Sequence, residues 1–409
     1  MSATRAAAGS GPRVVTRHPH VLANYARAEV NFVRGEGVYL FDESGNRYLD
    51  LVAGIAVCAL GHCHPDITRA VAQQAATLVH VSNLYQHEPA GTLADRLAQL
   101  SGFDSVFFCN SGAEANEAAI KLARKHAYRR GEPKRTTILA ANGSFHGRTF
   151  GALAATDNPK YKEGFEPLPA GFTWTPFNNV EALDRAIDDI TACFLVEPVQ
   201  GESGVVPATP EFLRAARRFC DERGALLIFD EVQCGMGRLG KLFASQFYGV
   251  RPDAFTLAKS LANGLPIGAL IVRGEAATAL RPGDHGTTFG GSPVPCAAAL
   301  AHLRVRDEID LDANVRAAGE LLFAGLAALA AEWPDVFAAP RGRGLMLGLP
   351  VREPYEARTI VDAARDEERL LVNAAGDNTI RIVPPLILSA EQVRDGLERL
   401  GRTLLRLQG

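Results

Sequence analysis

The stretch Asp-Ala-Phe-Thr-Leu-Ala-Lys at residues 253–259 is an apolar run that ends on a lysine, and a Gly-rich turn, Leu-Ala-Asn-Gly-Leu-Pro-Ile-Gly, follows it. A second apolar run, Ala-Leu-Leu-Ile-Phe at residues 225–229, ends on Asp230. Both runs have the length and composition of strands buried on two faces. They predict a covered sheet that delivers a lysine and an aspartate at the ends of its strands.

Similar apolar runs alternate with amphipathic segments between about residues 105 and 273. The predicted strands are 106–109, 137–140, 193–196, 226–229, 254–258 and 269–272, and the predicted helices between them are 114–130, 181–190 and 210–223. Continuous apolar strands separated by helices indicate an α/β fold with a mostly parallel sheet.

The pattern changes after about residue 293. Long helical runs are predicted at 294–306, 312–332, 355–369 and 390–407, with short strands at 345–349, 370–372 and 379–383. This mixture of long helices and short strands indicates a smaller α+β domain. Near the N-terminus, residues 37–50 are predicted to form a hairpin with a Ser-Gly-Asn turn. The predicted division is a disordered leader (1–20), an N-terminal segment packing with the small domain (21–65), a large domain (66–300) and a small C-terminal domain (301–409).

The composition narrows the function classes. The chain has 409 residues, 47% hydrophobic and 22% charged, and a formal net charge of −3, so it carries no basic field for nucleic acid. No apolar stretch of about 18 residues predicts a membrane span. Seven cysteines without a Cys-x-x-Cys pair favour free thiols in the cytoplasm, and His62-Cys63-His64 has no second ligand group that would complete a metal site. Residues 1–28, with four arginines and no acid, suit a transit peptide or a disordered leader, and we favour the leader.

A phosphate site is predicted where Val-Phe-Phe-Cys-Asn-Ser-Gly-Ala-Glu (106–114) passes from a strand into a helix. Free N–H groups and the positive end of the helix dipole favour an anion there, and Gly112 and Ala113 let it approach the backbone. The alternative is that Asn110 or Ser111 only caps the helix. The position at the carboxyl end of a strand favours the phosphate.

The lysine and the aspartate suit one cofactor, pyridoxal phosphate. Burial lowers the pKa of a lysine and frees its amine to attack a carbonyl, which is the role expected of Lys259. A buried carboxylate keeps a pyridine nitrogen protonated, so that the ring withdraws electrons; Asp230 is the candidate, with Gln233 reaching the phenolic oxygen. The alternative for Asp230 is a helix cap or a salt bridge at the strand end.

A competing motif lies beside it. Gly-Met-Gly-Arg-Leu-Gly at 235–240 matches the dinucleotide fingerprint, which would suit a nicotinamide dehydrogenase. However, Asp230 and Glu231 stand between the strand and the glycines, where they would repel a pyrophosphate, and the helix that follows is short. The motif at residues 235–240 is therefore weaker support for nicotinamide binding than Lys259 is for pyridoxal phosphate.

Two arginines could bind carboxylates. Arg148 follows a predicted strand, and Arg381 lies between Ile380 and Ile382, where desolvation is costly unless it meets an anion. Strand alternation could instead turn Arg381 to solvent. Glu202 lies in a Gly-bounded loop past a strand end and is expected to face the same cleft. Glu197 is interpreted as a supporting residue, and Phe145 as a ring that could stack on a pyridine.

At this point the chain resembles the class III, ω-amino group of pyridoxal phosphate aminotransferases of fold type I, and within it the enzymes that act on N2-acetylornithine. The motifs that carry the resemblance run in order along nearly the whole chain after residue 20: Asn24-Tyr25, Gly61–Pro65, Asn110–Glu117, Gly143–Thr149, Glu197–Gly204, Asp230–Gly237, Leu257–Ser260 and Gly286–Gly291.

The resemblance implies a set of roles. Lys259 would hold the cofactor covalently and carry protons, and Asp230 would pair with the pyridinium. The remaining cofactor contacts would be Ser111, Gly112, Ala113, Phe145, Glu231, Val232, Gln233 and, from the neighbouring subunit of a homodimer, Thr288. Tyr25, Arg148 and Thr287 would hold the carboxylate of the amino donor, Arg381 would hold 2-oxoglutarate, and no metal is expected.

The expected pairing of Arg381 with Glu202 has a physical reason. The donor presents an amine far from its carboxylate, whereas 2-oxoglutarate has a carboxylate next to its carbonyl. Glu202 would neutralise Arg381 while the donor binds and release it for 2-oxoglutarate, which leaves as glutamate. Ornithine δ-aminotransferases typically have an aromatic residue where this chain has Ile55, which disfavours free ornithine but does not separate acetyl from succinyl donors. The expected activity is transfer of the δ-amino group of N2-acetylornithine to 2-oxoglutarate in arginine biosynthesis; succinylornithine or ornithine aminotransferase and a cofactor-binding protein without turnover are the alternatives.

Overall fold

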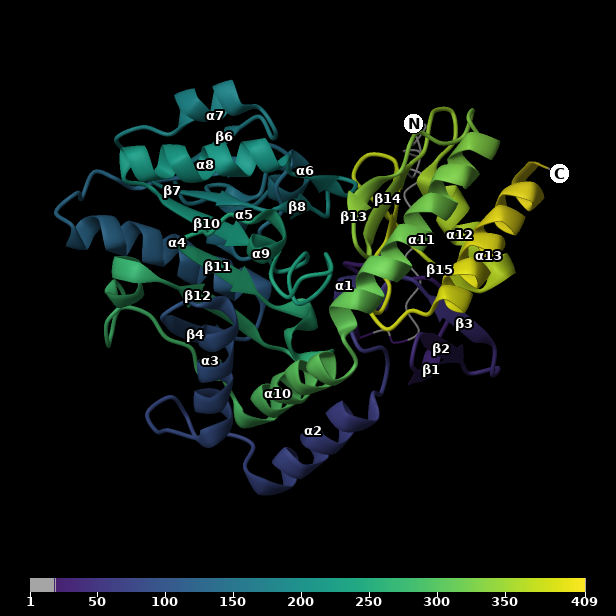
Figure 1. Ribbon diagram of the computed structural model, residues 1–409, viewed down its shortest axis with the longest axis horizontal. Helices are drawn as coiled ribbons and strands as arrows, with labels where there is room; N and C mark the ends of the chain where they lie inside the picture. The colour runs from purple at the N-terminus through teal and green to yellow at the C-terminus, as the bar shows by residue number, and fades with distance from the viewer. Residues whose placement is uncertain (1–17, 19, 409) are drawn as a thin grey trace, which may run out of the picture.

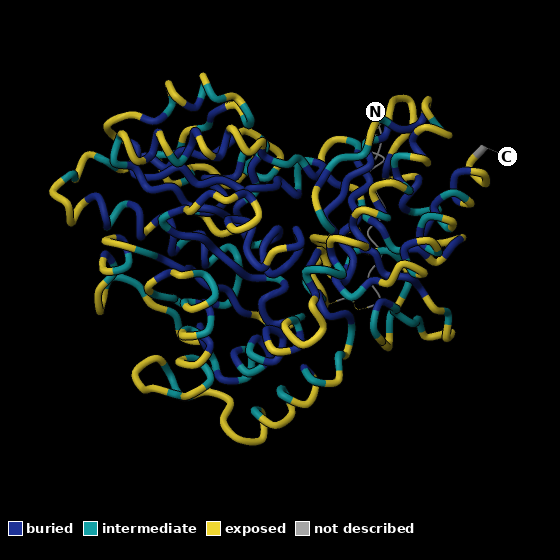
Figure 2. The backbone as a smooth tube through the Cα atoms, viewed as in Figure 1, coloured by how far each residue is buried: buried dark blue, intermediate teal, exposed yellow. Residues whose placement is uncertain are grey.

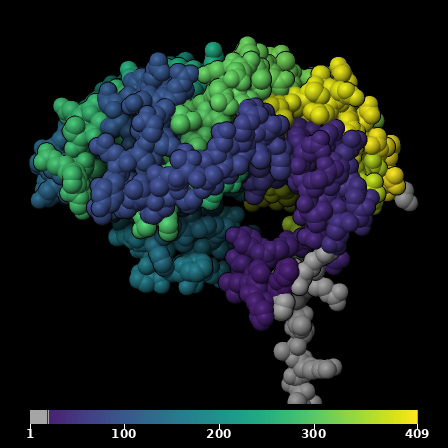
Figure 3. Space-filling model, turned by 90° about the horizontal axis from the view of Figure 1, so that it is seen from below, coloured from purple at the N-terminus to yellow at the C-terminus, as the bar shows by residue number. Residues whose placement is uncertain are grey.

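The computed structural model describes residue 18 and residues 20–408, so the predicted leader falls almost wholly outside the described residues. The chain forms a large lobe around one extended sheet and a smaller lobe that contains the C-terminal helices (Figure 1). The N-terminal residues lie alongside the C-terminal ones in the smaller lobe (Figure 3).

The large lobe is organised by a seven-stranded sheet in the order β4-β12-β11-β10-β7-β5-β6. The strands are β4 (Ser105–Cys109), β5 (Thr137–Ala141), β6 (Phe172–Thr175), β7 (Thr191–Val196), β10 (Leu226–Asp230), β11 (Ala254–Leu257) and β12 (Gly268–Val272). Only β12 runs against its neighbours, because it is antiparallel to both β11 and β4. The α/β prediction with a mostly parallel sheet is confirmed, and the edge strand β6 was missed.

Both faces of this sheet are covered, as the apolar runs predicted. Ile138, Leu195 and Ile228 pack under α4 (Gly112–Arg129), whereas the alternate residues Phe194 and Phe229 pack with α8 (Pro210–Arg223) on the other face. The strands are buried in the centre of the lobe, and exposed residues collect on the outer helices (Figure 2). Side chains with a period of two therefore fill two separate layers of core.

One predicted helix is shorter than expected. Helix α7 (Val180–Ala186) ends four residues before the predicted end at 190. Asp188 accepts hydrogen bonds from the Thr191 hydroxyl (2.7 Å) and from the Ile190 N–H (3.2 Å), which turns the chain toward β7. Local side-chain bonding of this kind competes with helix continuation.

The smaller lobe holds two four-stranded sheets and three helices. One sheet has the order β13-β14-β17-β16, and the other has the order β1-β2-β3-β15. The strands are β1 (Phe32–Glu36), β2 (Tyr39–Asp42), β3 (Arg47–Asp50), β13 (Arg341–Arg343), β14 (Met346–Pro350), β15 (Leu370–Leu371), β16 (Asn373–Ala375) and β17 (Thr379–Ile382); the helices are α11 (Leu311–Glu332), α12 (Ala357–Glu368) and α13 (Ala390–Gln408). The predicted hairpin is confirmed by the pairing of β2 with β3, and β3 pairs in parallel with β15, which joins the two ends of the chain.

Helix α10 (Pro293–Glu308) precedes the first helix of the smaller lobe and packs on α2 (Pro65–Thr77) and α3 (Glu88–Ser101). The predicted domain boundary at residue 300 falls inside α10. The other short elements are α1 (Ala53–Ala56), α5 (Phe150–Ala155), α6 (Pro159–Lys162), α9 (Ala244–Tyr248), η1 (Lys259–Ala262), η2 (Gly274–Thr278), β8 (Val199–Gln200) and β9 (Val206–Pro207). Among the described residues, α11 alone has the length and hydropathy to cross a membrane, a test that core helices also pass, and its Val315, Leu322 and Leu326 are buried in the core.

Candidate active site

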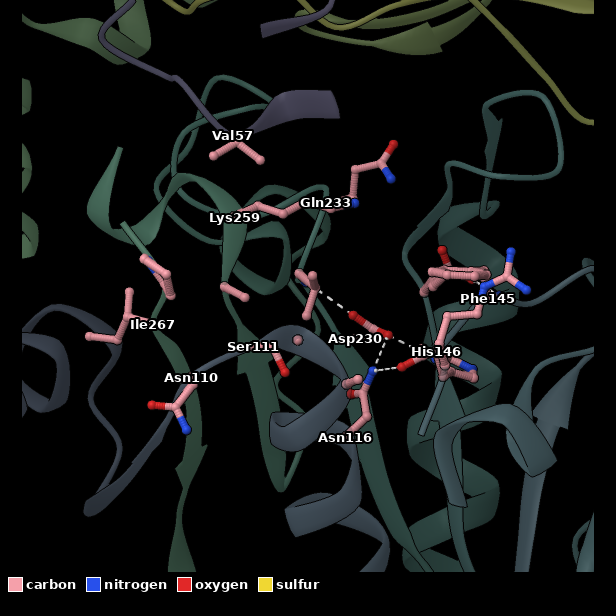
Figure 4. Close-up of a pocket in the computed structure, with 18 of the residues that line it drawn as sticks. Val57, Asn110, Ser111, Asn116, Phe145, His146, Asp230, Gln233, Lys259 and Ile267 are labelled. Atoms are coloured by element: carbon pink, nitrogen blue, oxygen red, sulfur yellow. Dashed lines mark hydrogen bonds and ion pairs between the residues drawn. The ribbon is translucent and has the colours of Figure 1, made fainter. Parts of the chain in front are cut away.

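A cavity of about 410 Å³ lies at the carboxyl ends of the parallel strands, beside the first turn of α4. Open α/β sheets bind ligands at this edge. Nine residues predicted from the sequence line this cavity: Ser111, Gly112, Ala113, Phe145, Arg148, Asp230, Val232, Gln233 and Lys259. Glu202, which was also predicted, bonds to Gln233. Figure 4 shows Asp230 and Asn116 on the floor of the cavity and Lys259 across from them.

The start of α4 forms a narrow cradle. Ser111 caps the helix by accepting a hydrogen bond from the Glu114 N–H (3.2 Å). A Cβ placed on Gly112 would lie 2.7 Å from Val232 Cγ1, and one on Gly147 would lie 2.6 Å from Ala113 Cβ. The helix start therefore carries its N–H groups close to the cavity wall, where an anion can approach the backbone. Ser111 acts as a cap, as the alternative interpretation of this turn had it, and this role is compatible with an anion site.

Asp230 is held by two side chains that the sequence reasoning missed. Its Oδ2 accepts hydrogen bonds from Asn116 Nδ2 (2.7 Å) and is 2.8 Å from His146 Nδ1, and its Oδ1 accepts from the Val232 N–H (3.0 Å). Asn116 in turn accepts from the Thr256 hydroxyl (2.9 Å). An asparagine on the buried face of a helix was the signal for Asn116, and His146 stands in the quoted Ser-Phe-His-Gly motif. This network fixes the direction of the carboxylate and satisfies it in a buried place.

Lys259 is half-buried beside the cavity and opens η1, two residues after β11 ends at Leu257. Burial lowers its pKa to about 8, with the Glu202 charge opposing this shift and the Arg381 charge adding to it. Part of the amine is therefore unprotonated near neutral pH, as a nucleophile or a general base requires.

Arg381 and Glu202 meet across the two lobes. Arg381, on β17, has 1% of its side chain exposed, and its Nη1 is 2.5 Å from Glu202 Oε1. Gln233 touches both partners, at 3.3 Å from Arg381 Nη1 and 3.4 Å from Glu202 Oε1. Burial raises the pKa of Glu202, but the Arg381 guanidinium outweighs burial and the net pKa is lowered. Arg381 does not point to solvent, so that alternative for it is wrong.

A third carboxylate supports the wall of the site. Glu197 is buried, and its Oε1 accepts a hydrogen bond from the Phe145 N–H (2.8 Å). Burial raises its pKa well above the ordinary value, and the charges of Asp230 and Glu202 raise it further. A proton on Glu197 limits the negative charge that gathers around Asp230.

Arg148 is exposed at the mouth of the cavity and stacks on aromatic rings. Its guanidinium carbon lies 3.6 Å from the centre of the Tyr161 ring and 5.6 Å from that of Phe145. Tyr161 was missed, since a single tyrosine in the short helix α6 carries no pattern. The rings hold the guanidinium without neutralising its charge, which leaves it available to a carboxylate.

Besides Glu202 and Arg381, four predicted residues do not line this cavity. Tyr25 is 63% exposed, Thr288 is exposed, and Thr287 accepts a hydrogen bond from Asn110 Nδ2 (3.1 Å). The Glu231 carboxylate accepts from the N–H groups of Ala244 (2.6 Å) and Ser245 (2.8 Å) and so caps α9. The Glu231 side chain therefore serves the fold, and its expected contact with a cofactor stays a prediction without support from this placement.

The turn at residues 235–240 is filled by the protein itself. Arg238 and Leu239 are buried, and a Cβ on Gly344 would lie 2.5 Å from the Arg238 carbonyl oxygen. The following helix, α9, has five residues. A pyrophosphate has no room at this turn, which removes the structural basis for nicotinamide binding.

Comparison with known proteins settles the family. The model of the family "Aminotransferase class-III" matches residues 22–404. The chain belongs to the class-III aminotransferases. It is 51% identical over 388 residues to the acetylornithine aminotransferase of Gloeobacter violaceus, covering 95% of this chain and 96% of the relative. It is 47% identical over 372 residues to that of Methanocaldococcus jannaschii, covering 91% and 92%.

Solved structures of class-III aminotransferases superpose on most of the chain. The N-acetylornithine aminotransferase of Stenotrophomonas maltophilia is 38% identical with a TM-score of 0.82, covering 94% of this chain and 98% of that one. The ornithine aminotransferase of Toxoplasma gondii is 33% identical with a TM-score of 0.91, covering 95% and 93%. The fold type I architecture expected from the sequence is therefore confirmed.

Class-III aminotransferases depend on pyridoxal phosphate. The residues of this class-III aminotransferase fit that group: the glycine-lined start of α4 suits its phosphate, the buried and bonded Asp230 suits a protonated ring nitrogen, and Lys259, which lines the cavity, suits its aldehyde. When bound, the cofactor supplies an electron sink for the bond that breaks at the substrate carbon.

Proposed function

We propose that this class-III aminotransferase transfers the δ-amino group of N2-acetyl-L-ornithine to 2-oxoglutarate, which yields N-acetylglutamate semialdehyde and glutamate. Relatives that carry the name acetylornithine aminotransferase, at 46–51% identity over nearly the full chain, support this choice. The physiological role that follows from it is a step of arginine biosynthesis in the cytoplasm.

The observation that carries the proposal is the difference between two arginines. Arg381 is neutralised by Glu202 at 2.5 Å, whereas Arg148 stacks on Tyr161 at the cavity mouth and no ion pair of it occurs among the described residues. A donor whose amine is far from its carboxylate can place that carboxylate on Arg148 without competition from Arg381. 2-Oxoglutarate, with a carboxylate next to its carbonyl, would instead displace Glu202 and bind Arg381 in a bidentate way.

Lys259 is proposed to carry the proton of the reaction. Its lowered pKa leaves a neutral amine that can take the proton from the δ-carbon of the donor. Asp230, held by Asn116 and His146, keeps its carboxylate aimed into the cavity throughout. Phe145 and Val232 form apolar parts of the cavity wall beside this proton transfer.

The test is a panel of donors. We expect kcat/KM with N2-acetylornithine and 2-oxoglutarate to exceed that with free ornithine by about tenfold or more, since an acylated amine no longer brings a second positive charge to the site. Succinylornithine separates the acetyl from the succinyl activity. A clear preference for free ornithine would overturn the proposal in favour of an ornithine aminotransferase, the alternative that the TM-score of 0.91 to the Toxoplasma gondii enzyme supports.

The assembly is proposed to be a homodimer in which Thr288 reaches the cofactor of the neighbouring subunit. Leu84, Tyr85 and Phe289 expose 84%, 68% and 62% of their surfaces, and Asn83 ties the two loops together by donating to the Thr287 (3.0 Å) and Gly290 (3.1 Å) carbonyls. Asn110, which lines the cavity, bonds to Thr287 of the second loop, so the two loops lie near the site. Exposed apolar residues of this kind are typical of a subunit contact. Neither nucleic acid nor a membrane enters the proposal.

A further inference from the structure

The segment at residues 50–62 contains a left-handed turn. Ala53, Gly54, Ile55 and Ala56 have φ values of 50°, 66°, 64° and 60°. Residues with a Cβ strongly disfavour this conformation, and a run of them persists only where surrounding contacts determine it. The contacts that stabilise this turn therefore indicate its role.

One set of contacts comes from inside the segment. Asp50, which is 2% exposed, accepts hydrogen bonds at Oδ1 from the N–H groups of Val52 (2.8 Å) and Ala53 (2.9 Å). Its Oδ2 lies 2.7 Å from His62 Nε2. Burial lowers the pKa of His62, but the hydrogen bond to Asp50 and the nearby Cys58 raise it to a net value of about 10, so His62 holds its proton at neutral pH.

A second set comes from the residues that follow Lys259. The Ser260 hydroxyl, on a side chain that is 3% exposed, donates to the Ala56 carbonyl at 2.7 Å. The Asn263 amide accepts from the Leu60 N–H (2.7 Å) and donates to the Gly61 carbonyl (3.1 Å). Three hydrogen bonds thus join the end of η1 to the 50–62 segment across a long separation in sequence.

Strain is present on both sides of this junction. Lys259 has a φ of 41° and Asn263 has a φ of 48°, so η1 begins and ends in left-handed backbone. His302 of α10 also contacts η1, with its Nδ1 at 3.3 Å from the Leu261 carbonyl. The lysine thus stands on a short, strained element whose position is set by side-chain contacts, because no regular ladder continues past β11.

The two joined elements face the same cavity. Val57, directly after the left-handed turn, lines the cavity with Lys259, and Figure 4 shows the two side chains close together at one edge of it. The junction therefore links the backbone that carries the Lys259 amine to the backbone that carries the Val57 wall of the cavity.

We propose that Ser260 and Asn263 are positioning residues for Lys259, which lock the amine and the Val57 wall into one geometry by tying η1 to the left-handed turn at Ala53–Ala56. This inference rests on the proposed role of Lys259. Neither residue touches the reacting atoms; each acts through the backbone that it holds.

The test uses two variants of the full-length, cofactor-loaded protein, Ser260→Ala and Asn263→Asp. Ser260→Ala removes the donor to Ala56, and Asn263→Asp replaces the donor to Gly61 by a repelling carboxylate of the same shape. The matched control is Ser101→Ala, which loses a hydroxyl-to-carbonyl bond of the same 2.7 Å length, to Leu97 in α3. Hydrogen exchange of a peptide covering residues 50–62 and steady-state kinetics with each substrate are the two readouts.

Both site variants are expected to exchange about five- to tenfold faster in the 50–62 peptide, the effect of one lost hydrogen bond, with no change in a peptide from α13. Since both half-reactions use Lys259, kcat is expected to fall about tenfold while both KM values stay within about twofold. Unchanged exchange, or faster exchange with an unchanged kcat, would overturn the inference. A wild-type protein with no turnover on any amine would instead refute the proposed function, while the exchange data would still report on the junction.

Discussion

At the scale of single residues, the site depends on groups whose neighbours change their ordinary chemistry. Desolvation lowers the pKa of Lys259, Asn116 and His146 orient the Asp230 carboxylate, and the ring of Tyr161 positions the Arg148 guanidinium. In each case the functional group was recognisable from the sequence, and the residues that tune it were not. Tuning partners come from other elements, so no local pattern marks them.

The first prediction concerns Tyr161. In Tyr161→Leu the Arg148 guanidinium loses the ring 3.6 Å below it, so KM for acetylornithine should rise about fivefold, the equivalent of a cation–π contact of about 1 kcal/mol. Tyr161→Phe keeps the ring and should behave like the wild type. Steady-state kinetics with each substrate varied in turn provide the measurement. An equal rise in KM for 2-oxoglutarate would contradict a role of Arg148 specific to the donor.

The second prediction follows from the lowered pKa of Lys259. In the cofactor-free protein the folded pKa is about 8, below the usual 10.5, so charging the buried amine opposes folding at pH 7. Between pH 8 and 10.5 the unfolded chain binds the extra proton, and stability rises with pH over that window. Lys259→Met should therefore have a higher Tm than the wild type at pH 7, with the gap narrowing toward pH 10. A gap that does not change with pH would show that Lys259 is not desolvated in the folded protein.

At the scale of elements, the direction of each strand and the contacts between elements were harder to predict than the elements themselves. The apolar runs predicted β4, β5, β7, β10, β11 and β12 closely, but the reversed direction of β12 is visible only in its pairing with β11 and β4. The predicted helix at 181–190 ended early because Asp188 formed a local turn. Strand β17 brings Arg381 to the loop that holds Glu202, a meeting of residues 179 positions apart.

The third prediction tests that junction. Glu202→Gln leaves the buried Arg381 without its counter-charge, so Arg381 should attract the donor carboxylate and raise KM for acetylornithine by about tenfold. KM for 2-oxoglutarate should stay level or fall, because no carboxylate has to be displaced. Stability should drop as well, since removal of one partner leaves an uncompensated buried charge. A parallel rise in both KM values would indicate general damage to the site.

At the scale of the whole molecule, the cavity lies between the large sheet and Val57 of the N-terminal segment, and the C-terminal lobe contributes Arg381 to the ion pair with Glu202. The N-terminal segment pairs with the C-terminal lobe through β3 and β15, which lie side by side in Figure 1. The same segment supplies the left-handed turn that bonds to Ser260, the residue after Lys259. The exposed patch at Leu84, Tyr85 and Phe289 is the face on which a second copy is proposed to lie.

The fourth prediction concerns that face. Phe289→Glu places a charge on a residue that is 62% exposed in the single chain, so the dimer should weaken by about tenfold or more and activity should fall at low protein concentration. Leu405→Glu, at an equally exposed apolar residue on α13, is the control and should leave the mass in solution unchanged. Light scattering over a concentration series measures both. A Phe289→Glu protein that remains as dimeric as the wild type would place the subunit contact elsewhere.

The sequence by itself determined the α/β class, most of the strands and helices but not α2, α3 and β6, and the lysine, aspartate and small-residue turn of the site. It could do so because burial on two faces, helix starts and strand ends leave local patterns in the residues. Tertiary structure alone decided that Asn116 and His146 bind Asp230 and that Tyr161 lies under Arg148. It also decided that the Glu231 carboxylate caps α9. Finally, it decided that Ser260 and Asn263 bond to the segment with the left-handed turn. These contacts join residues far apart in the chain, and their geometry exists only once the elements have packed.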